Sequence, residues 1–421
     1  MTDPEFLTAV SRSVDLRLAG DLSGAAELAD YVCAARPEEP SAWHTAAMVA
    51  SDLGLYRDAL YCRQRAVELL DVLATHTRLP DAHQQYIQQC VYGYATSLLL
   101  HGEWQRAWPF WEISRLGSSW MPVQGSNFWQ GETDGDLLVI CEGGYGDLFQ
   151  FMRFIPLLRA RVLARRIGII VFKGLKTFRN WKAIGADEVY EIGDEIPLGV
   201  WRYSTAFLSL PAMLGINWNA DVPRDKLGAC YEYASQGPVG FCWRSEEYAI
   251  KRRVRSLTWQ DAEEITGFLI DEAIPVHSLC PQGKDLAAGE FCHRTPNNLV
   301  CYSSRMETWG DTARYIAGMS MVVTVDTAVA HLAGLLGCPT LLLLPLNSDW
   351  RWGLVSEQTP WYPSVRLFRN QHPLKWERER IVDTALTMYR DVSGLDKEQD
   401  EESARDDWDA SHGDERCPTQ E

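Results

Sequence analysis

Residues 321–344 read MVVTVDTAVAHLAGLLGCPTLLLL, and this stretch decides the fold. A Val-rich run at 321–325 predicts a buried strand, 328–336 predicts a helix, and the run at 340–344 predicts a second buried strand. Parallel strands need a crossover connection, usually a helix, and strands that are covered on both faces are apolar throughout. The stretch therefore predicts one unit of an α/β fold with a parallel sheet.

The same alternation of short apolar strands and helices fills two runs of the sequence. The first run predicts strands at 137–141, 167–172 and 188–192, with a helix at 147–163. The second predicts strands at 239–243, 276–279, 321–325 and 340–344, with helices at 259–269, 308–317, 328–336 and 377–389. Two such runs, split by a loop-like stretch at 227–238, indicate two Rossmann-like halves with parallel sheets. A ligand would then bind between them, at the carboxyl ends of the strands.

The N-terminal third is helical by periodicity, and it repeats. Gly20 and Gly54 lie 34 residues apart, as do Ala25 and Ala59, and helices are predicted at 21–35 and 55–73. Gly102 marks the turn of a third helix pair. Because a 34-residue helix-turn-helix period is the signature of tetratricopeptide (TPR) repeats, we expect an all-α, TPR-like region over residues 1–118. A generic helical bundle is the alternative.

Composition and charge give the remaining boundaries. The Pro- and Gly-containing stretch 119–135 is expected to be a linker, 136–230 the first Rossmann-like half, 236–392 the second, and 393–421 an acidic, disordered tail. Between residues 391 and 421, 12 acids and 3 bases account for −9 of the net charge of −17. The rest of the chain is only mildly acidic, which disfavours binding to nucleic acid.

Cysteine usage and hydropathy bear on the compartment. The 11 cysteines include no CxxC pair and no zinc-like spacing, which suits a reducing environment. The apolar runs are too short and too interrupted for a transmembrane segment, and no secretory signal is visible at the first residues. We therefore expect a cytoplasmic protein without a transmembrane segment.

The first candidate site is the sequence CEGGYGD at 141–147, between a predicted strand and a predicted helix. Gly144 and Gly146 permit a tight turn and let a ligand approach the backbone. Asp147 would lie at the carboxyl end of the strand, where its carboxylate could take a proton from a hydroxyl group. A pure helix cap is an equally good interpretation of Asp147. The segment is not a dinucleotide fingerprint, because the GxGxxG spacing is absent.

The second candidate site follows the strand at 321–325. Asp326 and Thr327 are expected to cap the helix and leave the amides of its first turn free for a diphosphate. His331 lies just over one turn into that helix, within reach of a phosphate or a sugar hydroxyl. A lone His on an apolar helix is more often a core residue, so that alternative stays open.

The third candidate is a group of cations that follows the strand at 239–243. Arg244 and Arg255, with residues 251–253 (KRR), could neutralise phosphates, although a solvated charged loop fits the spacing equally well. Gln282 follows the next strand, where a contact to a ribose or base would fall. Trp350 and Trp352 are expected near the rim of the cleft, where they either stack on a ligand or only pack.

Together these segments resemble a known family. Residues 142–156 (EGGYGDLFQFMRFIP) are similar to the Gly-rich turn of TPR-containing bacterial glycosyltransferases related to the lipopolysaccharide heptosyltransferases, a group like glycosyltransferase family 9. Residues 326–339 (DTAVAHLAGLLGCP), then 345–352 (PLNSDWRW) and 361–363 (WYP), resemble the second signature of that family, and 102–115 its last helical repeat. The resemblance covers about residues 98–391.

This resemblance implies a GT-B fold whose first half faces the acceptor and whose second half holds the nucleotide-sugar donor. It implies that Asp326, Thr327 and His331 contact the donor and that Asp147 is the general base of an inverting displacement. Arg244 or one of residues 251–255 would stabilise the departing nucleoside diphosphate, without a metal or a cofactor. One departure is the loop 244–248, RSEEY, where the family usually has small residues.

We therefore expect a hexosyl- or heptosyltransferase-like enzyme that moves a sugar from a nucleotide-diphosphate donor to a glycan or protein acceptor. The helical repeats could grip that acceptor in their groove. The alternatives are an interaction protein with a weak or inactive transferase half, and a nucleotide-sugar epimerase. An epimerase would have no use for a peptide-binding groove.

Overall fold

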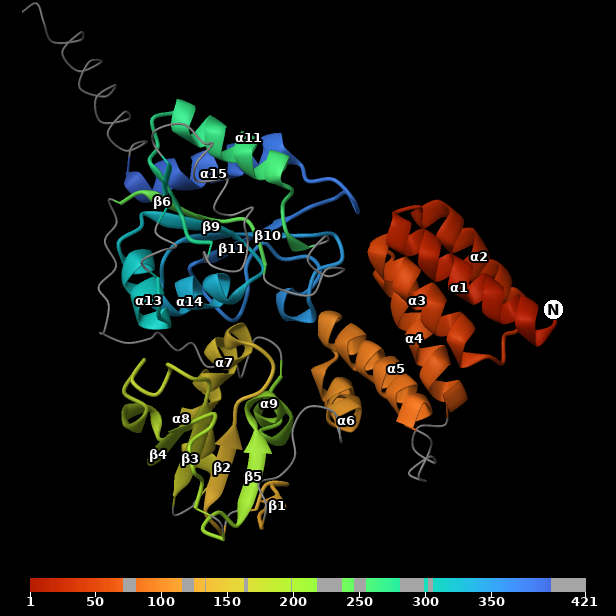
Figure 1. The fold of residues 1–421 in the computed structure, drawn as a ribbon, viewed down its shortest axis with the longest axis horizontal. Helices are drawn as coiled ribbons and strands as arrows, with labels where there is room; N and C mark the ends of the chain where they lie inside the picture. The colour runs from red at the N-terminus through yellow and green to blue at the C-terminus, as the bar shows by residue number, and fades with distance from the viewer. Residues whose placement is uncertain are drawn as a thin grey trace, which may run out of the picture.

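The computed structural model describes residues 1–70, 81–115, 125–132, 134–162, 166–197, 199–217, 237–245, 255–280, 299–301 and 306–394. Three parts are visible in Figure 1: an N-terminal helical region, a first α/β half and a second α/β half. The two halves lie one above the other, and the helical region stands beside them. The expected acidic tail and most of the expected linker lie outside the described residues.

Six consecutive helices form the described part of the helical region, and neighbours in the sequence pack against each other. Gly20, Gly54 and Gly102 follow the first helix of each pair with φ of 92°, 75° and 79°, a left-handed backbone that favours glycine at helix ends. This explains the glycine spacing in the sequence. The helices are α1 (Asp3–Ala19), α2 (Leu22–Ala35), α3 (Pro40–Asp52), α4 (Tyr56–Leu70), α5 (Asp81–Leu100) and α6 (Trp104–Arg115).

The first half is a five-stranded parallel sheet with strand order β1-β5-β2-β3-β4. Short helices connect and cover its strands. Its strands are β1 (Asn127–Phe128), β2 (Leu137–Ile140), β3 (Ile167–Val171), β4 (Glu188–Glu191) and β5 (Tyr203–Ala206). Its helices are α7 (Tyr145–Phe151), η1 (Met152–Phe154), α8 (Ile155–Arg161), η2 (Lys182–Ile184), η3 (Phe207–Ser209) and α9 (Leu210–Met213).

The second half is a six-stranded parallel sheet with strand order β11-β10-β9-β6-β7-β8. In Figure 1, α11 and α15 lie on one side of the sheet and α13 and α14 on the other. The strands are β6 (Val239–Cys242), β7 (Val276–Ser278), β8 (Leu299–Cys301), β9 (Met321–Val325), β10 (Thr340–Leu344) and β11 (Val365–Arg369). The helices are α11 (Trp259–Asp271), α13 (Trp309–Ala317), α14 (Ala328–Leu336), η5 (Trp350–Trp352) and α15 (Arg378–Ser393).

The helical region is joined to both halves. On the first half, Trp108 Nε1 donates to the carbonyl of Ile216 at 2.9 Å. On the second, Asn347 Nδ2 donates to Asp52 Oδ1 at 2.7 Å, and the Tyr56 hydroxyl donates to the carbonyl of Leu346. One continuous hydrophobic core runs through α5, α6 and both sheets, while α1, α2 and α3 share a separate, smaller core.

The predicted elements differ from the observed ones mainly in what was missed. The predicted helix at 147–163 begins at Tyr145 and is divided into α7, η1 and α8, since Pro156 opens α8. Strands β5 and β11 were not predicted, nor was β1, which lies inside the expected linker and pairs with β5. Among the described residues, no helix is both long and apolar enough to cross a membrane.

Candidate functional site

Both sheets reverse their strand order beside the strand that opens them. In the second sheet the reversal lies between β6 and β9, and in the first between β2 and β5. Ligands of open parallel sheets bind outside the carboxyl ends of the strands at such a switch point. The helices that follow β2 and β9, α7 and α14, pack against each other between the two sheets. The two switch points therefore open toward one another.

Gly146 explains how closely these helices approach. A Cβ placed on Gly146 would lie 2.9 Å from His331 Cδ2 and 3.4 Å from Ala328 Cα. Such distances are below or at the edge of normal contact, so the position leaves almost no room for a side chain. The glycine that the sequence suggested for ligand approach thus also permits helix-to-helix packing.

A cleft of about 870 Å³ lies at this junction. It takes residues from all three parts of the chain. These are Gln85, Gln88, Gln89, Tyr92, Trp111, Ser114 and Arg115 from the helical region, Glu142, Gly143, Gly144, Tyr145, Gly146, Asp147 and Leu208 from the first half, and Cys242, Arg244, Ser245, Arg255, Trp309, Asp326, Thr327, Ala328, Val329, His331, Asp349 and Arg351 from the second half.

The cleft brings together eight of the nine residues that the sequence singled out for catalysis or donor binding. They are Gly144, Gly146, Asp147, Arg244, Arg255, Asp326, Thr327 and His331. The ninth, Gln282, and the cations at 251–253 lie outside the described residues. The cleft is large enough for a nucleotide-sized ligand, given the usual range of about 300–1,000 Å³ for small-molecule sites.

Asp147 is the third residue of α7 and is held by two donors. Its Oδ2 accepts the backbone N–H of Gly144 at 2.7 Å, and its Oδ1 accepts Nη2 of Arg351 at 2.6 Å. Its side chain is 25% exposed, so the carboxylate can still meet a ligand in the cleft. The helix is capped by Gly144, so Asp147 supports the cap from the first turn while also facing the cleft.

The N-terminus of α14 is the corresponding feature of the second half. Thr327 is the cap, and its hydroxyl accepts the N–H of Val329 at 3.2 Å. Asp326 precedes the cap and accepts Nη2 of Arg255 at 2.5 Å. Burial raises the pKa of Asp326, and Arg255 opposes that rise. Asp326 therefore orients Arg255 beside the end of the helix rather than capping it.

His331 is buried between the two halves, with 5% of its surface exposed. Its Nδ1 lies 2.8 Å from the Tyr362 hydroxyl, and Trp352 stacks on its ring with centroids 5.2 Å apart. Burial lowers the pKa of His331 well below its usual value, and Arg351 and Arg153 lower it further. The imidazole is therefore neutral at pH 7 and can exchange hydrogen bonds with a ligand, but it contributes no positive charge.

The loop after β10 supplies two charged residues that the sequence did not single out. Asp349 and Arg351 both line the cleft, and Nη1 of Arg351 lies 2.8 Å from Asp349 Oδ1. The tryptophans that alternate with them, Trp350 and Trp352, are 3% and 1% exposed. Of the two roles considered for these tryptophans, packing is the one observed. The alternation of charged and apolar residues in Asp-Trp-Arg-Trp was the available signal.

The helical region forms one wall of the cleft. Gln85, Gln88, Gln89 and Tyr92 come from α5, and Arg115 from the end of α6. Arg115 makes a buried ion pair with Glu142, the residue before the glycine pair that leads into α7. A buried charge pair of this kind fixes geometry, because losing either partner would leave the other unpaired. The helical region is thus part of the site.

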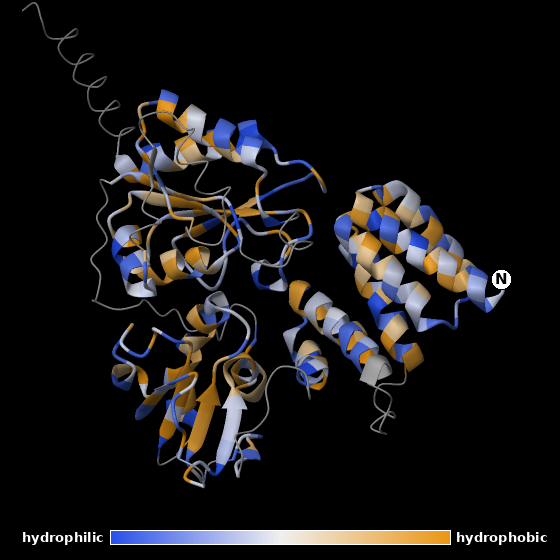
Figure 2. Cartoon of the chain, viewed as in Figure 1, coloured by the Kyte–Doolittle hydropathy of each residue, from blue (hydrophilic) through white to orange (hydrophobic). Residues whose placement is uncertain are grey.

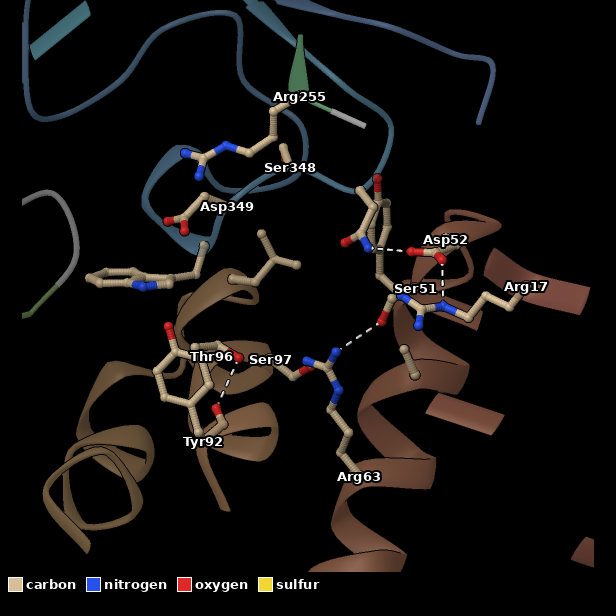
Figure 3. A pocket seen from close by; sticks show the side chains of 15 residues that line it. Arg17, Ser51, Asp52, Arg63, Tyr92, Thr96, Ser97, Arg255, Ser348 and Asp349 are labelled. Atoms are coloured by element: carbon tan, nitrogen blue, oxygen red, sulfur yellow. Dashed lines mark hydrogen bonds and ion pairs between the residues drawn. The ribbon is translucent and has the colours of Figure 1, made fainter. Parts of the chain in front are cut away.

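A second cavity, of about 280 Å³, adjoins the first (Figure 3). It lies where the helical region meets the loop after β10, and it shares Tyr92, Arg255 and Asp349 with the cleft. Arg63 extends into it from α4 and donates to the Ser51 and Ser97 hydroxyls at 3.1 and 2.7 Å. Polar space therefore continues from the cleft toward the helices.

The arrangement can serve one kind of chemistry well. The N–H groups at the start of α14, together with Arg244 and Arg255, offer positive charge to an anion. Across the cleft, Asp147 offers a carboxylate that can accept a proton. A carboxylate on one wall and an anion-binding helix end on the other suit a reaction in which a phosphate-linked group leaves as a hydroxyl attacks.

The sequence matches no protein-family model. It is 23% identical over 419 residues to protein FlbA of Caulobacter vibrioides, in an alignment that spans 85% of this chain. The chain covers 63% of the length of that curated relative.

Three solved structures are similar at a low level. They are ADP-heptose lipopolysaccharide heptosyltransferase II of E. coli (14% identity, TM-score 0.42, 60% of this chain and 98% of that one), a glycosyl transferase family 9 protein of Veillonella parvula (9%, 0.44, 63% and 100%), and a mutant O-GlcNAc transferase of Thermobaculum terrenum (12%, 0.36, 94% and 92%). At these scores the similarity by itself assigns no reaction to this chain.

Proposed function

We propose that this chain is an inverting glycosyltransferase that uses a nucleotide-diphosphate sugar. The observation that carries the proposal is the cleft, in which the switch points of two parallel sheets face each other. One wall presents the Asp147 carboxylate, and the opposite wall presents the capped start of α14 with Arg244 and Arg255. In this proposal the two halves form a GT-B arrangement and the helical region is a set of TPR-like repeats.

The proposed reaction is a single displacement. The Asp147 carboxylate accepts the proton of an acceptor hydroxyl as its oxygen attacks the anomeric carbon of the sugar. The bond between that carbon and the diphosphate breaks, and the electron pair leaves with the nucleoside diphosphate. Arg244, Arg255 and the amides of Thr327 and the first turn of α14 stabilise the departing charge. No metal is needed in this scheme, because guanidinium groups and helix amides take its place.

Each remaining site residue has a place in the same scheme. Asp326 holds Arg255 through the 2.5 Å contact, so it acts on the diphosphate through that side chain. Neutral His331 would hydrogen-bond the sugar or the diphosphate from the far side of α14. Gly144 and Gly146 keep the backbone of the first half close to the donor. The acceptor, a glycan or a protein, would lie against the α5 wall and the adjoining cavity.

The test begins with donor binding. Nucleotide-diphosphate sugars are screened by thermal shift, since a ligand that binds only the folded state must stabilise it, by about 2.7 kcal/mol at 100 times its Kd. With the donor identified, transfer is followed with EDTA present. Asp147→Asn is expected to keep the donor Kd within about twofold and to lower kcat by about 100-fold or more, the usual range for a general base.

Three results would contradict the proposal. Loss of donor affinity and transfer to the same extent in Asp147→Asn would make Asp147 a structural residue of α7. The absence of stabilisation by any nucleoside diphosphate would favour an interaction protein. Turnover without an acceptor that yields an epimerised sugar would favour an epimerase.

A further inference from the structure

We propose that Arg351 is the positioning residue for the Asp147 carboxylate, so that the base on the first half is completed by a side chain of the second half. The inference rests on the proposed transfer reaction, in which Asp147 takes a proton. It adds a residue that the sequence did not indicate, and it makes catalysis depend on contact between the halves.

The guanidinium of Arg351 reaches across the junction and binds α7 at two points. Its Nη2 donates to Asp147 Oδ1 at 2.6 Å, and its Nε donates to Gln150 Oε1 at 2.7 Å. Its Nη1 donates to Asp349 Oδ1 at 2.8 Å on its own loop. The planar guanidinium fork has a fixed geometry, so engaging three acceptors leaves it little freedom to move.

The surroundings hold Arg351 in this orientation. Its guanidinium lies 4.7 Å from the centre of the Trp350 ring, and its backbone carbonyl accepts Nε1 of Trp361 at 2.7 Å. The side chain is only 10% exposed. Burial alone would lower the pKa of Arg351, but the carboxylates of Asp349 and Asp147 raise it, so the side chain stays charged.

Asp147 itself is fixed but not saturated. One oxygen accepts from Arg351 and the other accepts from the N–H of Gly144, at 2.6 and 2.7 Å. Each carboxylate oxygen can accept more than one hydrogen bond. Since a quarter of the side chain is exposed, the carboxylate can still receive a proton from the cleft. Arg351 thus sets the direction of the carboxylate without blocking it.

Arg153 offers a matched control in the same interface. It is buried, and its Nη1 and Nε donate to the backbone carbonyls of Trp361 and Gln150 at 2.6 and 2.7 Å. It therefore also joins the second half to α7, but it is not among the residues that line the cleft. If Arg351 served only to hold the halves together, loss of either arginine would have the same effect.

The experiment compares Arg351→Ala and Arg153→Ala with the full-length wild type in kcat, donor KM, thermal stability and amide exchange at Gly144. We expect kcat of Arg351→Ala to fall by about 100-fold, the cost of misplacing a reacting group by about 1 Å, with donor KM changed less than about threefold. Added guanidinium ion should restore part of the lost kcat. Arg153→Ala should lower thermal stability and keep kcat within about threefold of the wild type.

An unchanged kcat in Arg351→Ala, or an equal fall in both variants, would overturn the proposal. If an alanine variant fails to fold, Arg351→Lys and Arg153→Lys replace the pair, since lysine keeps the charge but not the fork. The transfer reaction is judged separately, by wild type against Asp147→Asn. If the wild type transfers nothing, faster Gly144 exchange in Arg351→Ala but not in Arg153→Ala still supports the positioning role, and equal exchange overturns it.

Discussion

His331 is a hydrogen-bonding group whose neutral state is imposed by its surroundings. Burial is the main reason for its lowered pKa, and Arg351, Arg153 and Arg255 add to the effect, while Asp349 opposes it. In the unfolded chain the same side chain titrates near pH 6.5. Below that pH the unfolded state binds more protons than the folded state, so stability falls as the pH falls.

This asymmetry gives a prediction for His331→Gln. Between pH 7 and pH 5 the wild type should lose about 2 kcal/mol of folding free energy through His331, and the variant should not. Urea unfolding of both proteins at the two pH values measures the difference. His44, whose pKa burial lowers to about 4, contributes to both proteins equally and cancels. An identical loss in the variant would show that His331 is protonated in the folded protein.

At the scale of elements, the pairing of α7 with α14 joins the two halves at the site. Gly146 permits this contact, because a Cβ there would lie 2.9 Å from His331. Gly267, in α11, is a natural comparison, since a Cβ there would meet no atom within 4 Å. The two glycines therefore differ in purpose: one makes room for a neighbour, and the other only lowers helix stability.

Substitution of each glycine by alanine should have opposite effects. Gly146→Ala should cost about 1–3 kcal/mol, the usual price of overpacking a tight contact. Gly267→Ala should stabilise by about 0.5–1 kcal/mol through helix propensity. Chemical denaturation of the two variants measures both changes. Stabilisation of the protein by Gly146→Ala would mean that the helices lie farther apart than the structure has them.

Elements with strong apolar patterns could be predicted from the sequence, whereas others could not. The strands at 321–325 and 340–344 and the helix between them agree with β9, β10 and α14 to the residue. Strand β5 reads Tyr-Ser-Thr-Ala and is buried throughout, yet it is almost white in Figure 2, where β2 is orange. Its strand character comes from its neighbours in the sheet, which local composition does not reveal.

The candidate site shows the same division. Asp147 and Asp326 could be found because each follows an apolar strand, and a parallel sheet gathers the carboxyl ends of its strands at one edge. Arg351 could not be found in this way, because its role depends on which side chain of the other half lies opposite. The sequence also gave no measure of how much of the cleft the helical region would supply.

At the scale of the whole molecule, two separate cores predict two levels of local stability. The larger core includes α5, α6 and both sheets, while Phe6, Val32 and Val49 belong to the smaller core of α1–α3. Contiguous units with their own buried contacts can open separately in native-state hydrogen exchange. The first three helices should therefore exchange through an opening that leaves the cleft intact.

Val32→Ala tests this division. Val32 is fully buried in the smaller core, so the substitution should cost about 1–3 kcal/mol. The expected result is faster amide exchange in α1–α3, with unchanged protection in α14 and unchanged donor affinity. An equal increase across α14 and the two sheets would mean that the chain unfolds as a single unit.

The contacts of the helical region with both halves also restrict how the cleft can widen. Asp52 and Tyr56 attach the helices to the loop that carries Arg351, and Trp108 and Trp111 attach them to the first half. A brace along one side makes a jaw-like motion swing from that side, so the free margin opens first. A bulky substrate would then enter away from the helices, while a chain bound along them would meet the mouth at its hinge.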